Sequence, residues 1–464
     1  QEELAEECAY EARMAGVMYK LEQAETGIIL QFLGFSSRLG ALAAAVAQKM
    51  ASLGEVREGI WRVVRDKQER LLSNAAQRAQ AYSQAMAALE EFLLFQRRTA
   101  DELYRAVERM QRRDLSGVNR RLFGNCLVEA LVVGNLTETG ARALLGAVLQ
   151  PLEVNAGGHG PEMVPPREEA ELPRDPSLTV LSVEGTNPDD ANSCAVQNLC
   201  CVAEVTPENE ALTSLLMQVV KPRFFNEVRT KRQLGYVVSS FMRTRVSFIS
   251  LVFLVQTERA PEVARRCIDG FLCQAWHYLL HEITREEFEH HRDGLVRQLE
   301  EAPRNLWESL QRDWLPIEER TWTFDSRQRQ VAFLRRSSLS TLQQLVQTRL
   351  LHAPRLAVLV RSSKVSTPSG FAGDERGAQY LNKATVTHFR GRLLRRGMDT
   401  TFERVADAWQ LSDLVRRQPL QEASQGSTGE AQGRTDELAL LGKSREAAQE
   451  ESAEVTAQEE AEAE

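Results

Sequence analysis

The stretch FFNEVRTKRQLGYVV, residues 224–238, decides how the second half of the chain is expected to fold. Its first part is polar and basic, carries Arg229, and reads as the end of a helix. Gly235 stands at a natural C-cap position for that helix. An apolar run then begins at Tyr236, which predicts the start of a strand. The stretch therefore predicts a helix–strand junction that presents an arginine and a tyrosine.

Outward from this junction, the pattern alternates between strands and helices. Apolar runs predict strands at 178–184, 192–204 and 353–363, and a strand pair within 235–256. Helical spacing predicts helices at 207–233 (broken by Pro222), 261–278, 285–299 and 339–350.

The first half repeats much of this order. It predicts a helix over 4–18, a strand pair in VMYKLEQA and TGIILQFLGF, helices near 39–52, 57–72, 80–110 and 137–149, and a strand at 127–133. Aligning Gly16 on Gly235 gives an offset of 219 residues, and the later helices align at roughly 227. This indicates an internal duplication, with a coincidental order of elements as the alternative. In the alignment Tyr10 and Val17 stand where the second half has Arg229 and Tyr236.

These patterns predict an α+β protein of two homologous αβ domains, each a mainly antiparallel sheet with helices packed on it. The expected boundaries are a first domain at 1–152, a linker rich in Gly and Pro at 153–176, a second domain at 177–365, a weakly structured extension at 366–410 and an acidic, disordered tail at 411–464.

Composition excludes several classes of protein. The net charge of −8 comes from the acidic tail, so it says nothing about a substrate. No apolar stretch reaches the ~18 residues of a membrane helix, no signal or transit peptide is visible, and basic and aromatic residues form no nucleic-acid-binding stripe. Seven scattered cysteines favour a reducing compartment, so we expect a cytoplasmic protein. The start at Gln1, inside a helical pattern, is what a fragment would show.

No metal site is expected in this chain. His277 and His281 share a helix face, but no carboxylate lies between them as in H-E-x-x-H or H-x-x-E-H, and Glu282 should point elsewhere. Amphipathic packing is the favoured interpretation of the pair, and a zinc site the disfavoured one. The cysteines around 194–201 read as small apolar core residues. No nucleophile elbow, Walker loop or dinucleotide-binding glycine motif is present.

Arg229 and Tyr236 remain as candidate functional residues. An arginine and a tyrosine hydroxyl at one helix–strand junction could bind a carbonyl oxygen or a developing oxyanion. The alternative is a solvated basic helix face with a tyrosine at the edge of the core.

The same stretch resembles the C-terminal half of pitrilysin-type zinc metallopeptidases, especially their insulysin-like and nardilysin-like members. The resemblance extends over about residues 4–361 and includes ECAYEARMAGVMYKLEQAETGIILQFLGFSSRL, NSCAVQNLCCVAEV and ITREEFEHHRDGLVRQLEEAPRNLWE. It implies that 1–152 is an N-terminally truncated third domain and 177–365 a fourth domain. Together they would form one lobe of a clamshell that closes around a peptide.

The resemblance also implies a division of labour. Zinc is expected in the intact enzyme, bound through H-x-x-E-H by an N-terminal half that this chain lacks, and none is expected here. Arg229 and Tyr236 would bind substrate and the oxyanion, and Phe225 would line the pocket near the cleaved bond. The implied partners are the N-terminal catalytic half (in the same polypeptide or a separate subunit) and peptide substrates, with a homodimer as a further option and with neither nucleic acid nor membrane.

Two functions follow. The leading one is the substrate-binding half of an insulysin-like zinc metalloendopeptidase, inactive on its own. The alternative is a non-catalytic pseudo-peptidase subunit or assembly scaffold. Retention of both Arg229 and Tyr236 favours the first.

Overall fold

The computed structural model describes residues 14, 16–24, 27–52, 56–124, 126–154, 168–174, 178–366, 378–382, 385–390, 393 and 395–397. The predicted helix at 4–18, apart from Met14 and residues 16–18, and the predicted acidic tail lie outside these residues. The domain boundaries given above stay predictions.

The second half is built around a six-stranded sheet with the order β6-β7-β5-β8-β4-β9. Its strands are β4 (Leu178–Glu184), β5 (Ser193–Val202), β6 (Val238–Thr244), β7 (Ile249–Thr257), β8 (Arg355–Arg361) and β9 (Ala378–Leu381). From β6 to β8 the neighbours are antiparallel, whereas β4 runs parallel to β8 and β9. The sheet is mixed but mainly antiparallel, which confirms the predicted α+β class.

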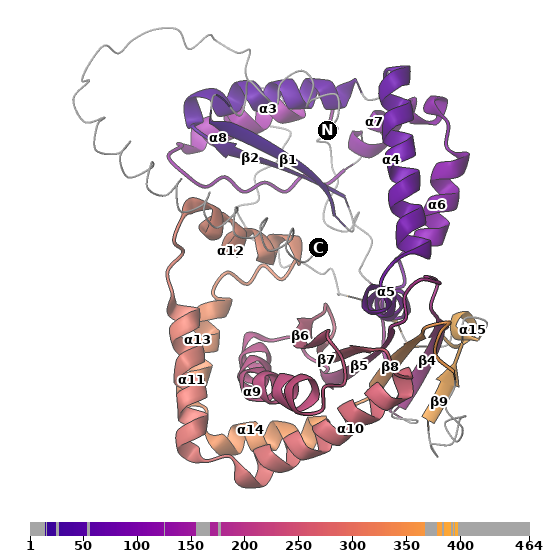
Figure 1. Cartoon of the computed structure of the whole chain (residues 1–464). Coiled ribbons are helices and arrows are strands. Elements are labelled where there is room, and N and C mark those ends of the chain that lie inside the picture. Colours follow the sequence, from indigo (N-terminus) through magenta and orange to yellow (C-terminus); the bar gives the residue numbers. More distant parts are fainter. Residues whose placement is uncertain are drawn as a thin grey trace. The chain divides into compact units, whose positions relative to one another are not determined.

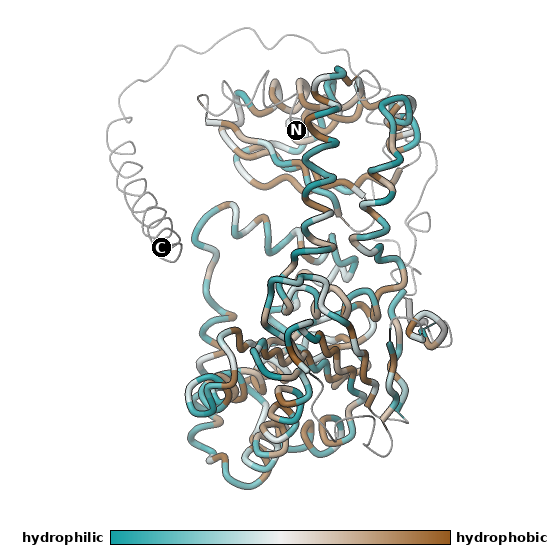
Figure 2. Tube along the Cα trace, turned by 45° about the vertical axis from the view of Figure 1, so that its right-hand side comes forward, coloured by the Kyte–Doolittle hydropathy of each residue, from teal (hydrophilic) through white to brown (hydrophobic). Residues whose placement is uncertain are grey.

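One face of the sheet packs against α9 (Pro207–Phe225) and α10 (Pro261–His277) (Figure 1). Phe224, Phe253 and Phe271 form the aromatic centre of this core, with ring centroids 5.0–6.3 Å apart. Every residue of β7 is buried, which explains the unbroken apolar run LVFLV at 251–255. Figure 2 shows hydrophobic residues gathered along these strands and helices.

The other face is covered by α5 (Ala81–Leu93), a helix from the first half of the sequence. Ala81, Ala85 and Leu89 are buried at four-residue spacing, so one stripe of the helix faces the sheet. At its far end, the buried carboxylate of Glu90 pairs with Arg243 and Arg245. A helix 85 residues before β4 thus completes the second-half core.

The first half contains a two-stranded antiparallel sheet, β1 (Val17–Gln23) and β2 (Ile28–Gly34). One side of this sheet packs against α3 (Ser36–Ala51) and α8 (Glu138–Leu149). The predicted strand at 127–133 is wrong, because this segment pairs with no strand among the described residues. Its residue Val128 packs instead against the β1–β2 core.

Other elements refine the sequence predictions. The helix predicted at 80–110 is two helices, α5 and α6 (Ala100–Arg109), with an interruption at 94–99. Pro222 does not break its helix, since α9 continues through it. The remaining elements are α4 (Glu58–Gln77), η3 (Arg112–Leu115), α7 (Val118–Phe123), β3 (Glu168–Ala170), η5 (Asn226–Lys231), η6 (Tyr278–Glu282), α11 (Arg285–Glu300), α12 (Leu306–Glu318), α13 (Ser326–Arg336), α14 (Leu339–Leu345), η7 (Val346–Leu350), α15 (Val386–Arg390) and β10 (Arg395–Gly397).

Within the described ranges, no helix is both long and apolar enough to cross a membrane.

Candidate functional site

The candidate site lies where α9 runs into η5, a π-helical turn. The amide of Arg232 donates to the carbonyl of Glu227 at 3.1 Å, which is the five-residue spacing of a π-helix. Such turns hold an extra residue and occur often at functional sites. Here the extra residue changes how the side chains after Phe225 are directed.

Gly235 is needed for a reason other than the predicted C-cap. The residue with a positive φ is Gln233, at 48°, and the π-helical turn is capped at Arg232. At Gly235 a Cβ would lie 1.8 Å from the carbonyl oxygen of Gln256 in β7. Only glycine permits this approach of the chain to the sheet. The Thr257 hydroxyl also donates to the carbonyl of Leu234 at 2.6 Å, so the backbone just before Tyr236 is fixed.

The three residues predicted for the site come together. The guanidinium carbon of Arg229 lies 4.6 Å from the centroid of the Tyr236 ring and 5.2 Å from that of Phe225. Both distances are within the range of cation–π attraction. Tyr236 is 74% exposed and Phe225 42% exposed, while Arg229 is half-buried. The arrangement is a solvent-facing aromatic and cationic surface, held on a rigid backbone.

Lys231 and Arg232 each pair with a carboxylate, whereas among the described residues Arg229 pairs with none. Lys231 and Arg232 both pair with Glu227, at 3.3 and 3.0 Å. The hydrogen bond from Arg232 and the nearby Lys231 lower the pKa of Glu227. In the part of the chain that the structure describes, Arg229 makes neither an ion pair nor a hydrogen bond. Its five N–H donors are therefore available to a ligand.

A polar network supports the end of α9, and sequence reasoning missed it. Arg223 donates to Glu287 of α11 at 3.2 Å and lies over the Tyr278 ring, with its guanidinium carbon 3.5 Å from the ring centroid. The Tyr278 hydroxyl donates to the same carboxylate. Burial and this hydrogen bond raise the pKa of Tyr278 to about 12. Although burial opposes it, the bonds from Tyr278 and Arg223 lower the pKa of Glu287.

The two histidines of α10 and η6 do not form a metal centre. The rings of His277 and His281 lie 4.9 Å apart. Contrary to expectation, Glu282 does not point away, because the π-helical turn η6 places its Oε1 3.1 Å from Nδ1 of His277. Across the described residues, no group of three or more His, Cys, Asp or Glu side chains could hold a metal ion. These residues do not fit a catalytic zinc.

The cysteines of β5 are packing residues rather than nucleophiles. Cys194 and Cys201 are buried, and Cys200 is half-buried. Burial raises the pKa of Cys201 to about 12 and also raises that of Cys194. Their thiols stay protonated and unreactive at neutral pH.

Comparison with known proteins gives two matches to family models. Residues 1–106 match the middle or third domain of peptidase M16, and residues 215–314 match domain 4 of the C-terminal lobe of PqqF-like PQQ synthase. The chain is related to the C-terminal half of the pitrilysin-type (M16) peptidases. This confirms the resemblance seen in the sequence.

Curated relatives resemble the chain in sequence, and a solved structure resembles it in fold. The insulin-degrading enzyme of Homo sapiens is 26% identical over 333 residues, which is 71% of this chain and 32% of the relative. That of Drosophila melanogaster is 25% identical over 336 residues, 72% of this chain and 33% of the relative. The crystal structure of pitrilysin superposes with a TM-score of 0.72 at 19% identity, covering 85% of this chain and 40% of pitrilysin. The chain thus spans about a third of the length of these curated relatives.

Proposed function

We propose that the chain is the substrate-binding half of a pitrilysin-type zinc metalloendopeptidase, and that Arg229, Tyr236 and Phe225 contact the bound peptide. The observation that carries this proposal is the position of Arg229. It is held against two exposed aromatic rings and lacks the carboxylate partner that each neighbouring cation has. Its N–H donors are therefore available to a ligand.

Each side chain has a chemical role that its surroundings allow. Arg229 donates hydrogen bonds to a peptide carbonyl and is attracted to the negative charge that develops on it. The Tyr236 hydroxyl is a second donor on the same side. The exposed Phe225 ring packs against an apolar substrate side chain and, with Tyr236, limits the positions that the guanidinium can adopt. Because these donors are already in place, little reorganisation is needed when charge develops.

Zinc belongs to the other half of the enzyme in this proposal. A bound zinc ion would polarise the peptide carbonyl and activate a water molecule. The described residues of this chain have no group that fits it. The partner is therefore a metal-bearing N-terminal half, and closing the two halves around a peptide completes the site. Peptide substrates are inferred from the relatives, which include insulin-degrading enzymes.

Two measurements on the purified chain test this proposal. First, the chain alone should neither retain stoichiometric zinc nor cleave a fluorogenic peptide. Hydrolysis without an added partner would overturn the division of labour. Second, fluorescence anisotropy with fluorescein-labelled insulin B chain should show saturable binding. If the peptide does not bind, the chain is better explained as a non-catalytic scaffold subunit.

A further inference from the structure

A second candidate site lies at the end of the six-stranded sheet's strands that is opposite to the end carrying Arg229 and Tyr236. β4 and β8 are parallel neighbours, so the segments that lead into both strands meet at one end of the sheet. β5 is antiparallel to β8, and β7 is antiparallel to β5. The last residues of β5 and the first residues of β7 therefore lie at the same end of the sheet. Four chain segments that are distant in sequence thus converge there.

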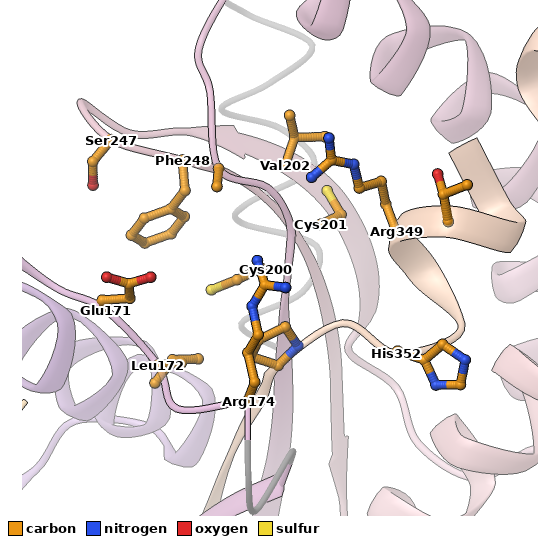
Figure 3. A pocket seen from close by; sticks show the side chains of 13 residues that line it. Glu171, Leu172, Arg174, Cys200, Cys201, Val202, Ser247, Phe248, Arg349 and His352 are labelled. Carbon is orange, nitrogen blue, oxygen red and sulfur yellow. The ribbon is translucent and has the colours of Figure 1, made fainter. Parts of the chain in front are cut away.

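These segments enclose a pocket of about 120 Å³. Figure 3 shows its walls, with Arg174 from the segment before β4 and Arg349 from η7, both directed toward the thiol-bearing end of β5. The lining residues are Glu171, Leu172, Arg174, Cys200, Cys201, Val202, Ala203, Ser247, Phe248, Thr348, Arg349, His352 and Pro354.

The charges of the pocket are unbalanced. Its lining includes two arginines but one carboxylate, Glu171, which already has an interaction of its own. Neither Arg174 nor Arg349 makes an ion pair or hydrogen bond in the part of the chain that is described. By contrast, Arg355 just beyond the pocket pairs with Asp269 at 3.1 Å. Two uncompensated guanidinium groups on one small concavity attract an anion.

The rest of the lining is apolar or neutral. Phe248, Val202 and Pro354 supply carbon surface, and burial keeps the neighbouring thiols protonated. A β-bulge between Cys200 and Val202 interrupts the β5–β7 ladder at the pocket, and such bulges are frequent beside binding sites. The volume is somewhat below the ~150 Å³ of an apolar cavity known to accept benzene, so the body of a ligand is limited to about one small ring.

We propose that this pocket binds a small organic anion, a carboxylate or phosphate group carried on an apolar body, with Arg174 and Arg349 holding the anionic head. The pocket is separate from the Arg229–Tyr236 site. β7 runs for nine residues from one end of the sheet to the other, so the length of this strand, roughly 27 Å, separates the two sites. A ligand here touches neither Arg229 nor Tyr236, so this proposal stands or falls independently of the proposed peptidase role.

Titration of the full chain with three probes tests the site. Phenyl phosphate and benzoate carry an anionic head on one ring, and benzyl alcohol is the neutral control. At 0.15 M NaCl, calorimetry should show saturable one-site binding of at least one of the two anions, and no binding of the alcohol. The anion that binds more tightly shows whether the pocket prefers a phosphate or a carboxylate head group. Absence of saturable binding for both anions at millimolar concentration overturns the proposal, as does equal binding of the alcohol.

Variants assign any binding to the pocket. Arg174→Gln together with Arg349→Gln should weaken the bound anion at least tenfold. The matched control is Arg297→Gln with Arg336→Gln, which removes two exposed charges from α11 and α13 and should leave the affinity unchanged. Equal loss in both double variants would show a non-specific charge effect and overturn the site. Unchanged thermal unfolding of all variants is required, and Arg349→Lys, which retains the charge, should recover part of the affinity.

Discussion

The guanidinium carbon of Arg229 lies 4.6 Å from the ring centroid of Tyr236, across the end of a π-helical turn. The equivalent position in the first half shows why this pair is unusual. Val17, which stands opposite Tyr236 in the proposed alignment of the two halves, is 3% exposed and belongs to the core of its own half, whereas Tyr236 is 74% exposed. At this aligned position Val17 is used for packing, and Tyr236 is presented to solvent.

The approach of Gly235 to β7 predicts a large effect of a single methyl group. Gly235→Ala would place its Cβ against the carbonyl oxygen of Gln256, so the chain must shift away from the sheet. We expect a loss of about 3 kcal/mol in the free energy of unfolding, measured by urea denaturation. Gly294→Ala is the control, since nothing lies within 4 Å of that Cβ and alanine favours its helix by about 1 kcal/mol. Equal denaturation midpoints for the two variants would contradict the steric account.

The buried ion cluster predicts that α5 is tied to the second-half sheet. Glu90 is 6% exposed and pairs with both Arg243 and Arg245. Glu90→Gln removes the buried negative charge that Arg243 and Arg245 share, and breaking a buried pair costs about 3–5 kcal/mol. The comparison is Glu289→Gln, which removes a solvent-exposed pair with Arg285 and should change the stability little. If both variants unfold at the wild-type urea concentration, the cluster does not hold the helix to the sheet.

The lowered pKa of Glu287 predicts a pH dependence with a definite sign. A carboxyl group whose pKa is lower in the folded state stabilises that state above its unfolded pKa, here near 4.5, and this stabilisation is lost as pH falls. His291 also lies 4.0 Å from the Glu287 carboxylate, so its protonation adds to the difference in unfolding free energy between wild type and Glu287→Gln as pH falls from neutral. Below about pH 4.5, where Glu287 itself takes up a proton, that difference should shrink. A difference that keeps growing below pH 4.5 would mean that Glu287 is not held as the anion by Arg223 and Tyr278.

Much of the second-half sheet could be predicted because each strand shows an apolar pattern within its own few residues. β7 contains the unbroken apolar run LVFLV and is buried on both faces, and the predicted strand 178–184 is β4 itself. The cover of the other face could not be predicted, since α5 looks like any amphipathic helix and its partner strands come much later in the chain. β9 was missed because its four residues give too short a pattern.

The site was predicted only as far as its residue types. Arg229, Lys231 and Arg232 occur within four positions, and nothing in the sequence says which of them lacks a partner. The answer depends on where Glu227 lies after a π-helical turn, and regular helical spacing does not reveal that turn. The network of Arg223, Tyr278 and Glu287 likewise joins three separate elements.

The role of Arg229 in substrate binding is tested most directly by anisotropy with the labelled insulin B chain, comparing wild type, Arg229→Met and the control Arg336→Met. Methionine keeps an aliphatic body between the two rings but removes the N–H donors. A lost charge-assisted hydrogen bond is worth about 1.5–3 kcal/mol, so Arg229→Met should weaken peptide binding at least about tenfold, while the control binds as wild type. Wild-type affinity in a correctly folded Arg229→Met variant would contradict the account.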